Sequence, residues 1–447
     1  MSSGRHLFHK WDAGVAPDLP RVERAYDEFL VTAEGEELVD AAAGAAVANL
    51  GHSVPGVAGI MAEQAERVSY ISTSHFRHAA PEALAERLAD LAPADLDSVF
   101  LVGSGSEGNE AAFKLAHAYH RARGNPGKHK VVSRWQAYHG STLGALAASG
   151  NTTRRTPFDP MLPDWPHVGP AYPYRWGYEG TPEEQARSAA RELETTVRQE
   201  GPGTVAAFVA EPVGGASIPA ARPHPAYYEE VRRICDEYDV LFVADEVMTG
   251  FGRTGELFAV EHYGVVPDLL VVGKGLSAGY APISAVVVRE TVTEPFRAGG
   301  EGSFPHGHTY AATPVAAAVA GHVLERYTAD LLATGRERGE RIRAELEPLE
   351  SHPMVGEIRH AGAMLGVEFV ADRETKAPFD PDLRVHERVY DAAMERGVYT
   401  YPGRGSVDGV AGDHLMLAPP LNVSEASAER IGRTVVEAVE AVAGDVL

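Results

Sequence analysis

Residues 269–286 read LLVVGKGLSAGYAPISAV, and this stretch decides the fold. Four apolar residues in a row are followed by Lys274, which stands between Gly273 and Gly275. A lysine is rarely buried without a partner, because it is costly to remove an ammonium group from water. The stretch therefore predicts a buried strand that ends at a functional lysine, with a compensating group elsewhere in the chain.

Four other apolar runs also end at a polar residue or a glycine. They are SVFLV (98–102), KVVS (130–133), VAAFVA (205–210) and VLFVA (240–244). Each is typical of a strand buried on both faces. Helical patterns lie between several of them, at 107–122 and at 226–240 for example. In the latter, one helix face carries Tyr227, Val231, Ile234, Cys235 and Tyr238. We expect an α/β fold with a mostly parallel sheet covered by helices on both sides.

The polar residues after these runs are candidates for one site. In parallel sheets, ligands bind outside the carboxyl ends of the strands. Ser104, Tyr138, Glu211, Asp245 and Lys274 all fall at or just beyond such ends. We therefore expect these five side chains to surround a single cavity.

The chain is long enough for more than one domain. Beyond about residue 325 the pattern changes to helix (330–350), strand (364–370), helix (383–397), strand (414–421) and helix (424–442). We predict a large domain over residues 56–325 and a smaller α+β domain over residues 326–447. Residues 1–55, with extended pieces at 27–40, are expected to pack on the small domain.

Composition excludes several classes of protein. The 447 residues are 44% hydrophobic and 23% charged, as in an ordinary globular protein, and the net charge of -23 disfavours a nucleic-acid or anionic-membrane partner. Cys235 is the single cysteine, which excludes an internal disulfide and fits the reducing cytoplasm. The first 14 residues lack the apolar segment of an export signal, and no run is long enough to span a bilayer.

Gly103-Ser104-Gly105-Ser106 joins a predicted strand to a helix that starts near Glu107. Glycines allow close approach to an anion, and a helix N-terminus offers free N–H groups, so this turn fits a phosphate. Alternatively, Ser106 is simply the helix N-cap. The turn is neither a Walker loop nor a GxGxxG motif, which disfavours ATP and NAD.

Asp245 and Lys274 are separated by about one strand–helix–strand unit, which can place them on neighbouring strand ends. A lysine in a dry pocket has a lowered pKa and can form a Schiff base with an aldehyde. A simple ion pair between the two residues, or a capping role for Asp245, is the alternative. Together with the phosphate turn and the flat ring of Tyr138, the pair matches the needs of pyridoxal 5'-phosphate.

Longer motifs carry a family resemblance. They include SGSEGNEAAFKLAHAY, AYHGSTLG, ICDEYDVLFVADEVMTGFGRTGELFAVEH, PDLLVVGKGLSAGYAPISAV and HGHTYAATPVAAAVA. Over nearly its whole length the chain resembles class III aminotransferases, the omega-type branch of the fold type I pyridoxal-phosphate enzymes.

The resemblance implies a role for each matching residue. Lys274 would form the Schiff base and carry protons, Asp245 would pair with the pyridine nitrogen, and Tyr138 and Val247 would contact the two ring faces. Gly105 and Ser106 would bind the phosphate, and Thr309 would reach the phosphate of a neighbouring subunit, which implies a homodimer with shared active sites. Glu211 and His139 would support the site, and Arg253 is interpreted as structural.

Departures from well-known subgroups leave the substrate open. Gly214 and Ala216 stand where relatives carry a gating carboxylate, and Met416 stands where some carry a carboxylate-binding arginine. Arg404 is the nearest substitute, although a loop arginine is more often simply solvated. Ala45 and Ala46 either line a pocket for a bulky amine or only pack. We expect a ping-pong transfer from an amine or omega-amino acid to pyruvate or 2-oxoglutarate.

Other functions stay open at this point. A decarboxylase, racemase or aminomutase could use the same fold, because the cofactor can promote cleavage of several bonds at one carbon. A catalytically idle cofactor-binding homologue is a further alternative, which the intact Lys274, Asp245 and Tyr138 disfavour. His306 and His308 lack further ligands at suitable spacing, so we expect no metal site.

Overall fold

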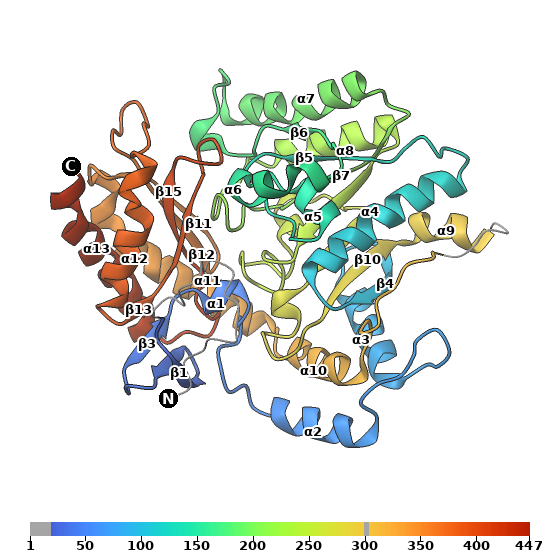
Figure 1. Ribbon diagram of the computed structural model, residues 1–447, viewed down its shortest axis with the longest axis horizontal. Coiled ribbons are helices and arrows are strands. Elements are labelled where there is room, and N and C mark those ends of the chain that lie inside the picture. The colour runs from blue at the N-terminus through green and yellow to red at the C-terminus, as the bar shows by residue number, and fades with distance from the viewer. Residues whose placement is uncertain (1–18, 299–303) are drawn as a thin grey trace.

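The computed structural model describes residues 19–298 and 304–447. The expectations for the first 14 residues, and for the start of the predicted 1–55 segment, therefore lie outside the described residues. A seven-stranded sheet occupies one half of the molecule, and two four-stranded sheets lie in the other half together with the C-terminus of the chain (Figure 1).

The seven-stranded sheet is mostly parallel. In spatial order it contains β4 (Leu96–Val102), β10 (Ser284–Arg289), β9 (Leu269–Val272), β8 (Leu241–Glu246), β7 (Val205–Ala210), β5 (Lys130–Arg134) and β6 (His167–Val168). Strands β9, β8, β7, β5 and β6 pair in parallel, and β10 pairs antiparallel with both β9 and β4. Because β4 and β9 are both antiparallel to β10, they run in the same direction. All five predicted strands therefore end at the same edge of the sheet.

Helices cover both faces of this sheet, as the apolar runs predict. In β9, Leu269 and Val271 face one core, and Leu270 and Val272 face the other. The first core is completed by α4 (Gly105–Ala122), α5 (Leu143–Ala148) and α9 (Glu290–Ala298). The second is completed by α3 (Ala79–Leu91), α7 (Pro182–Glu200), α8 (Ala226–Tyr238) and α10 (Pro314–Leu324). Helix α2 (Val57–Arg67) packs against α10.

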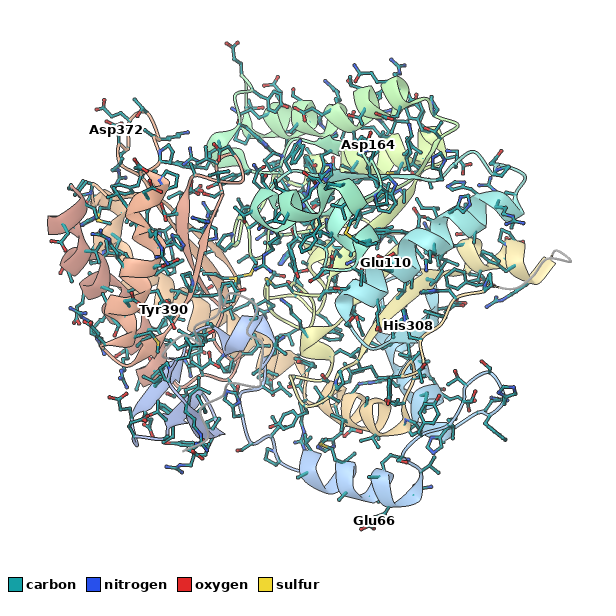
Figure 2. All side chains as sticks on the ribbon, in the orientation of Figure 1. Glu66, Glu110, Asp164, His308, Asp372 and Tyr390 are labelled. Carbon is teal, nitrogen blue, oxygen red and sulfur yellow. The ribbon has the colours of Figure 1, made fainter. Side chains whose placement is uncertain are left out.

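A separate core lies in the C-terminal part. Its sheet has the order β11 (Val355–Ala361), β12 (Met364–Phe369), β15 (Asp413–Leu417) and β14 (Tyr401–Arg404). Helices α11 (Ala329–Glu345), α12 (Val385–Met394) and α13 (Glu425–Val446) pack on it. Figure 2 labels Tyr390 on α12, and its ring lies 6.2 Å from the ring of Tyr399.

The N-terminal strands join this C-terminal core. Strands β1 (Val22–Tyr26), β2 (Phe29–Thr32) and β3 (Glu37–Asp40) form a sheet with β13 (Val398–Tyr399), in which Val39 pairs with Val398. Val39 is fully buried in the same core as α12 and α13. Strand β3 therefore packs on the same core as α12 and α13, and the predicted division of the chain at residues 55 and 325 stays a prediction.

Candidate active site

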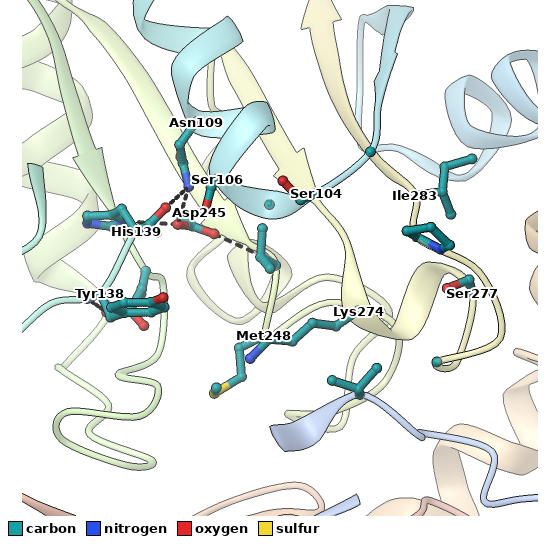
Figure 3. A pocket seen from close by; sticks show the side chains of 18 of the residues that line it. Ser104, Ser106, Asn109, Tyr138, His139, Asp245, Met248, Lys274, Ser277 and Ile283 are labelled. Atoms are coloured by element: carbon teal, nitrogen blue, oxygen red, sulfur yellow. Dashed lines mark hydrogen bonds and ion pairs between the residues drawn. The ribbon is translucent and has the colours of Figure 1, made fainter. Parts of the chain in front are cut away.

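A cavity of about 520 Å³ opens at the carboxyl edge of the large sheet. Ser104, Tyr138, Glu211, Asp245 and Lys274 all line it, as the strand ends predict. Figure 3 shows Asp245, His139 and Asn109 joined by hydrogen bonds on one side, with Lys274 extending across the cavity toward Met248. Gly105, Ser106, His139 and Val247 also lie in its wall.

Lys274 follows strand β9, at the start of the short 3-10 helix η4 (Lys274–Leu276). Its backbone is left-handed, with φ 43°, which turns the chain sharply after the strand. Its Nζ donates a hydrogen bond to the carbonyl oxygen of Ala45 at 3.0 Å. Burial lowers the pKa of Lys274 to about 8, although the carboxylates of Asp245 and Glu211 oppose this shift. A neutral, nucleophilic amine is therefore accessible near neutral pH.

Asp245 lies on β8 beside β9, paired in register with Val271. Its side chain is 4% exposed. Oδ2 accepts hydrogen bonds from Asn109 Nδ2 at 2.8 Å and from His139 Nδ1 at 2.7 Å, and Oδ1 accepts one from the Val247 N–H at 3.1 Å. These three donors fix the position of the carboxylate. The described residues contain no direct ion pair between Asp245 and Lys274, which disfavours the simple ion-pair interpretation.

Asn109 is a site residue that the sequence interpretation missed. It is fully buried on α4, and its Nδ2 donates both to Asp245 and to the carbonyl oxygen of His139, each at 2.8 Å. A signal was present, because helical spacing places Asn109 on the same apolar face as Ala112 and Phe113. A polar residue on a buried helix face needs a partner.

The N-cap of α4 is a different serine from the one that the sequence analysis offered as an alternative. The helix begins at Gly105, and Ser104 is its N-cap, whose Oγ accepts a hydrogen bond from the Glu107 N–H. The alternative that Ser106 is the cap is therefore wrong. Ser106 Oγ instead accepts a hydrogen bond from the Ser141 N–H at 3.1 Å. A Cβ at Gly105 would lie 2.8 Å from Cγ1 of Val247, so only glycine keeps the turn close to β8.

Tyr138 presents a half-buried ring at the cavity. Its N–H donates to Glu211 Oε2 at 3.3 Å, and the guanidinium carbon of Arg154 lies 4.8 Å from the ring centre. Glu211 Oε1 also accepts the Gly215 N–H at 3.2 Å. Burial raises the pKa of Glu211. The loop after β5 is thus tied to the loop after β7, which fixes the position of the ring.

Several predicted substrate or structural residues lie outside the cavity wall. Ala46 packs in a small apolar cluster with Met248 and Met416, and Met248 also lines the cavity. Arg404 is exposed at the end of β14. Fully buried Arg253 donates to the carbonyl oxygens of Ala363 and Pro419 and to Asn49 Oδ1, as a structural residue does.

Thr309 is exposed in the segment after residue 304. Its neighbour His308, labelled in Figure 2, lies 3.9 Å from Glu107 at the start of α4. The rings of His306 and His308 are 4.9 Å apart. Within residues 19–298 and 304–447, no cluster of three or more histidine, cysteine, aspartate or glutamate side chains is arranged to hold a metal. No helix in those ranges is both long and apolar enough to cross a membrane.

The residues present fit pyridoxal phosphate. The cavity offers an amine with a lowered pKa, a carboxylate held in place by two side-chain donors, an aromatic ring, and a glycine turn at the N-terminus of an 18-residue helix. Asn109 Oδ1 and His139 Nε2 are buried beside the cavity without a partner in the described structure. This set of groups matches the aldehyde, the ring nitrogen, the ring face and the phosphate of that cofactor.

The model of the family "Aminotransferase class-III" matches residues 12–439. The chain therefore belongs to the class III aminotransferases, which are enzymes that use pyridoxal 5'-phosphate. It has the α/β fold of the fold type I group.

Its relatives include named and structurally solved aminotransferases. The uncharacterized aminotransferase YodT of Bacillus subtilis is 39% identical over 435 residues, which is 96% of this chain and 97% of the relative. The putrescine–pyruvate aminotransferase of Pseudomonas aeruginosa is 33% identical over 92% of this chain and 88% of the relative. The structure of an omega-transaminase from Pseudomonas jessenii in complex with PMP superposes with a TM-score of 0.91, at 32% identity over 99% of this chain and 97% of that chain.

Proposed function

We propose that this aminotransferase takes the amino group from an amine or omega-amino acid and passes it to pyruvate or 2-oxoglutarate. The observation that carries the proposal is the placement of the Lys274 amine and the Asp245 carboxylate at neighbouring strand ends of one cavity. The family, and the activity named for the putrescine–pyruvate relative, support the choice of substrates.

Pyridoxal phosphate, when bound, supplies an aldehyde that links covalently to an amine and a ring that withdraws electrons from the adjacent carbon. Lys274 would hold that aldehyde between turnovers. Once released by the donor, its amine would take a proton from the donor carbon and return one later, as base and then acid. An amine with a pKa of about 8 suits both steps near neutral pH.

The remaining residues would hold and orient the cofactor. Asp245 would keep a proton on the ring nitrogen, because its carboxylate is buried and held in place by Asn109 and His139. The ring would lie between Tyr138 and Val247. The phosphate would bind at Gly105 and Ser106, where the α4 N-terminus offers backbone N–H groups. Glu211 would fix the Tyr138 loop.

Part of the cavity wall is apolar. Val47, Met248 and Ile283 line the cavity, and Met248 belongs to the cluster that contains Ala46 and Met416. A lining of this kind favours a donor with an apolar or uncharged body beside its amino group. Ala45 and Ala46 stay proposed residues of a pocket for a bulky amine, and Arg404 stays the proposed partner of a substrate carboxylate. Because the Arg404 side chain is exposed, it would have to move toward the substrate to bind it.

We further propose a cytoplasmic homodimer in which Thr309 reaches the cofactor phosphate of the partner subunit. The exposed position of Thr309 supports the second part, and the single, buried Cys235 fits a reducing compartment. This arrangement is tested by sedimentation of the wild type and of Thr309→Ala, together with measurement of how much cofactor each protein releases on dilution. Monomeric, fully active enzyme would contradict it.

The main test uses the purified enzyme loaded with pyridoxal phosphate. Its visible absorption is recorded before and after a panel of amines is added without any keto acid. We expect one class of amine to convert the bound cofactor to its aminated form, and pyruvate or 2-oxoglutarate to reverse the change. Donor-dependent release of carbon dioxide, or racemisation, would instead assign a decarboxylase, racemase or aminomutase. Turnover by Lys274→Ala would contradict the role of Lys274.

A further inference from the structure

The contact between Lys274 and Ala45 joins the large sheet to the N-terminal part of the chain. Lys274 Nζ donates to the Ala45 carbonyl oxygen at 3.0 Å, across 229 positions in sequence. Ala45 belongs to the short turn α1 (Ala43–Ala46), which follows strand β3. The catalytic amine therefore rests on the main chain of a segment outside the sheet that carries the lysine.

The neighbouring carbonyl groups of this turn have other partners. The Ala42 carbonyl oxygen accepts the Ala46 N–H at 2.8 Å, and that of Ala43 accepts the Val47 N–H at 2.9 Å. The Gly44 carbonyl oxygen accepts the Tyr399 hydroxyl at 3.2 Å. Because these bonds orient the turn, the Ala45 carbonyl points at the lysine and not at a neighbour in the turn.

The backbone of the turn is strained. Ala43, Gly44 and Ala46 have φ values of 45°, 68° and 55°, and alanine rarely adopts this left-handed region. Local preference does not stabilise such a conformation, so surrounding contacts must impose it. Strain of this kind is typical of segments that position a functional group.

Asp40, the last residue of β3, supplies those contacts. Its side chain is 1% exposed. Oδ1 accepts the N–H groups of Ala42 at 3.1 Å and Gly44 at 3.2 Å, and Oδ2 accepts the Gly44 N–H at 3.0 Å. Oδ2 also lies 3.4 Å from His52 Nε2. The carboxylate thus ties together both sides of the strained turn.

We propose that Asp40 is a positioning residue that fixes the Ala45 carbonyl as the docking point of the Lys274 amine whenever the lysine is not bonded to the cofactor. The inference deepens the proposed function and rests on the role given there to Lys274. The docked amine stays in the cavity with its proton held at Nζ, from where it can return to the reacting carbon. No covalent bond changes in this docking step.

Other charged groups also act on the lysine. Asp245 and Glu211 favour its protonated form, and Arg253 and Arg154 disfavour it. The Ala45 carbonyl adds a hydrogen bond to the protonated form, which raises the pKa of Lys274 relative to a cavity without that acceptor. If the turn moves away, the pKa falls and more of the amine is neutral and reactive at pH 7.

The experiment measures reductive methylation of Lys274 in the cofactor-free enzyme between pH 6 and 10, followed by peptide mass spectrometry. Asp40→Glu keeps the charge but displaces the carboxylate, whereas Asp40→Asn keeps the size and the Oδ1 acceptor. We expect Asp40→Glu to lower the titration midpoint of Lys274 by about one pH unit and Asp40→Asn to change it by less. Asp27→Asn, an exposed aspartate before β2, is the matched control and should not shift it.

Tyr399→Phe provides a milder variant in case Asp40→Glu does not fold. It removes only the hydroxyl bond to Gly44, so we expect a smaller shift in the same direction. In the loaded enzyme, kcat should fall about tenfold in Asp40→Glu while KM for the amine donor changes less than about threefold. This pattern fits lost positioning of the lysine rather than lost binding.

Two outcomes would overturn the proposal. One is an unchanged midpoint in both Asp40→Glu and Tyr399→Phe. The other is a shift in Asp40→Asn with none in Asp40→Glu, which would make Asp40 a remote charge and not a positioning residue. Borohydride reduction of the loaded wild type separately shows whether the cofactor is attached to Lys274. Failure of that attachment would refute the proposed function, while the methylation midpoints would still report on docking.

Discussion

Replacing Lys274 by methionine should make the cofactor-free enzyme more stable at neutral pH. A lysine pKa that falls from 10.5 to about 8 on folding means that folding disfavours the charged amine. Below pH 8 the folded protein must still hold the ammonium, so the full penalty is present there. Methionine has a similar length and needs no such compensation.

The magnitude follows from the pKa difference. Each unit of pKa difference corresponds to about 1.4 kcal/mol, so the shift from 10.5 to about 8 sets an upper value of about 3.5 kcal/mol. Lys274 lines the cavity and is partly accessible to water, and methionine loses the hydrogen bond to Ala45. These two effects reduce the expected gain to about 2 kcal/mol.

The pH dependence gives the sharper test. Between pH 8 and 10.5 the unfolded chain binds a proton at this position that the folded chain does not bind. Wild-type stability should therefore rise with pH over that window, and the advantage of Lys274→Met should shrink.

Urea unfolding of both cofactor-free proteins at pH 7 and pH 10 measures this difference. Lys114→Met, at an exposed lysine on α4, is the control. Equal unfolding midpoints for wild type and Lys274→Met at pH 7, or an advantage that grows toward pH 10, would refute the reasoning.

Three further predictions concern other buried polar side chains. Asn109→Leu removes a hydrogen bond to the buried Asp245 carboxylate, so it should weaken pyridoxal phosphate binding about tenfold in a titration of the cofactor-free enzyme. The control Asn422→Leu, at an exposed site, should leave the affinity unchanged. Equal affinities for the two variants would count against the role of Asn109. Arg253→Met removes the donor to the acceptors at Ala363, Pro419 and Asn49, so it should lower the free energy of unfolding by about 3 kcal/mol. Urea unfolding with and without cofactor measures this loss. A loss seen only in the loaded enzyme would instead indicate that Arg253 contacts the cofactor. Burial raises the pKa of Glu246 to about 7, so the free energy of unfolding of the wild type should fall as pH rises from about 4.5 to 7. Glu246→Gln should lose this pH dependence, because its amide does not titrate but can still bond Thr249 and the Val260 N–H. Urea unfolding of both proteins across that pH range measures the difference.

Much of the cavity edge of the large sheet could be predicted from the sequence, because the predicted buried strands end at polar residues that an apolar run does not explain. Asp245 and Lys274 follow runs of this kind, and β8 and β9 do lie side by side. Alternation between two cores explains why LLVV is apolar throughout. The helix at 107–122 is predicted within two residues of α4 (Gly105–Ala122).

Other features depend on contacts between distant parts of the chain. Strand β10 lies antiparallel between β9 and β4, and nothing in its own apolar pattern gives its direction or its partners. The Ala45 contact is a main-chain contact, so the identity of the side chain gives no signal of it. Asn109 is the intermediate case, because its position on a helix face indicates burial but not its partner.

Several unfavourable features of this chain lie where the edge of the large sheet meets the N-terminal turn. Lys274 has an amine whose pKa is lowered by burial, Ala43 and Ala46 have left-handed backbones, and Asn109 and His139 each keep a buried polar atom that has no partner among the described residues. In the alternating core of β9, by contrast, local preference and tertiary structure agree. A chain selected for stability alone would remove such conflicts, so we propose that those around this cavity serve the cofactor and the lysine. The expected gain in stability of Lys274→Met, together with loss of turnover, would measure this trade-off at a single residue.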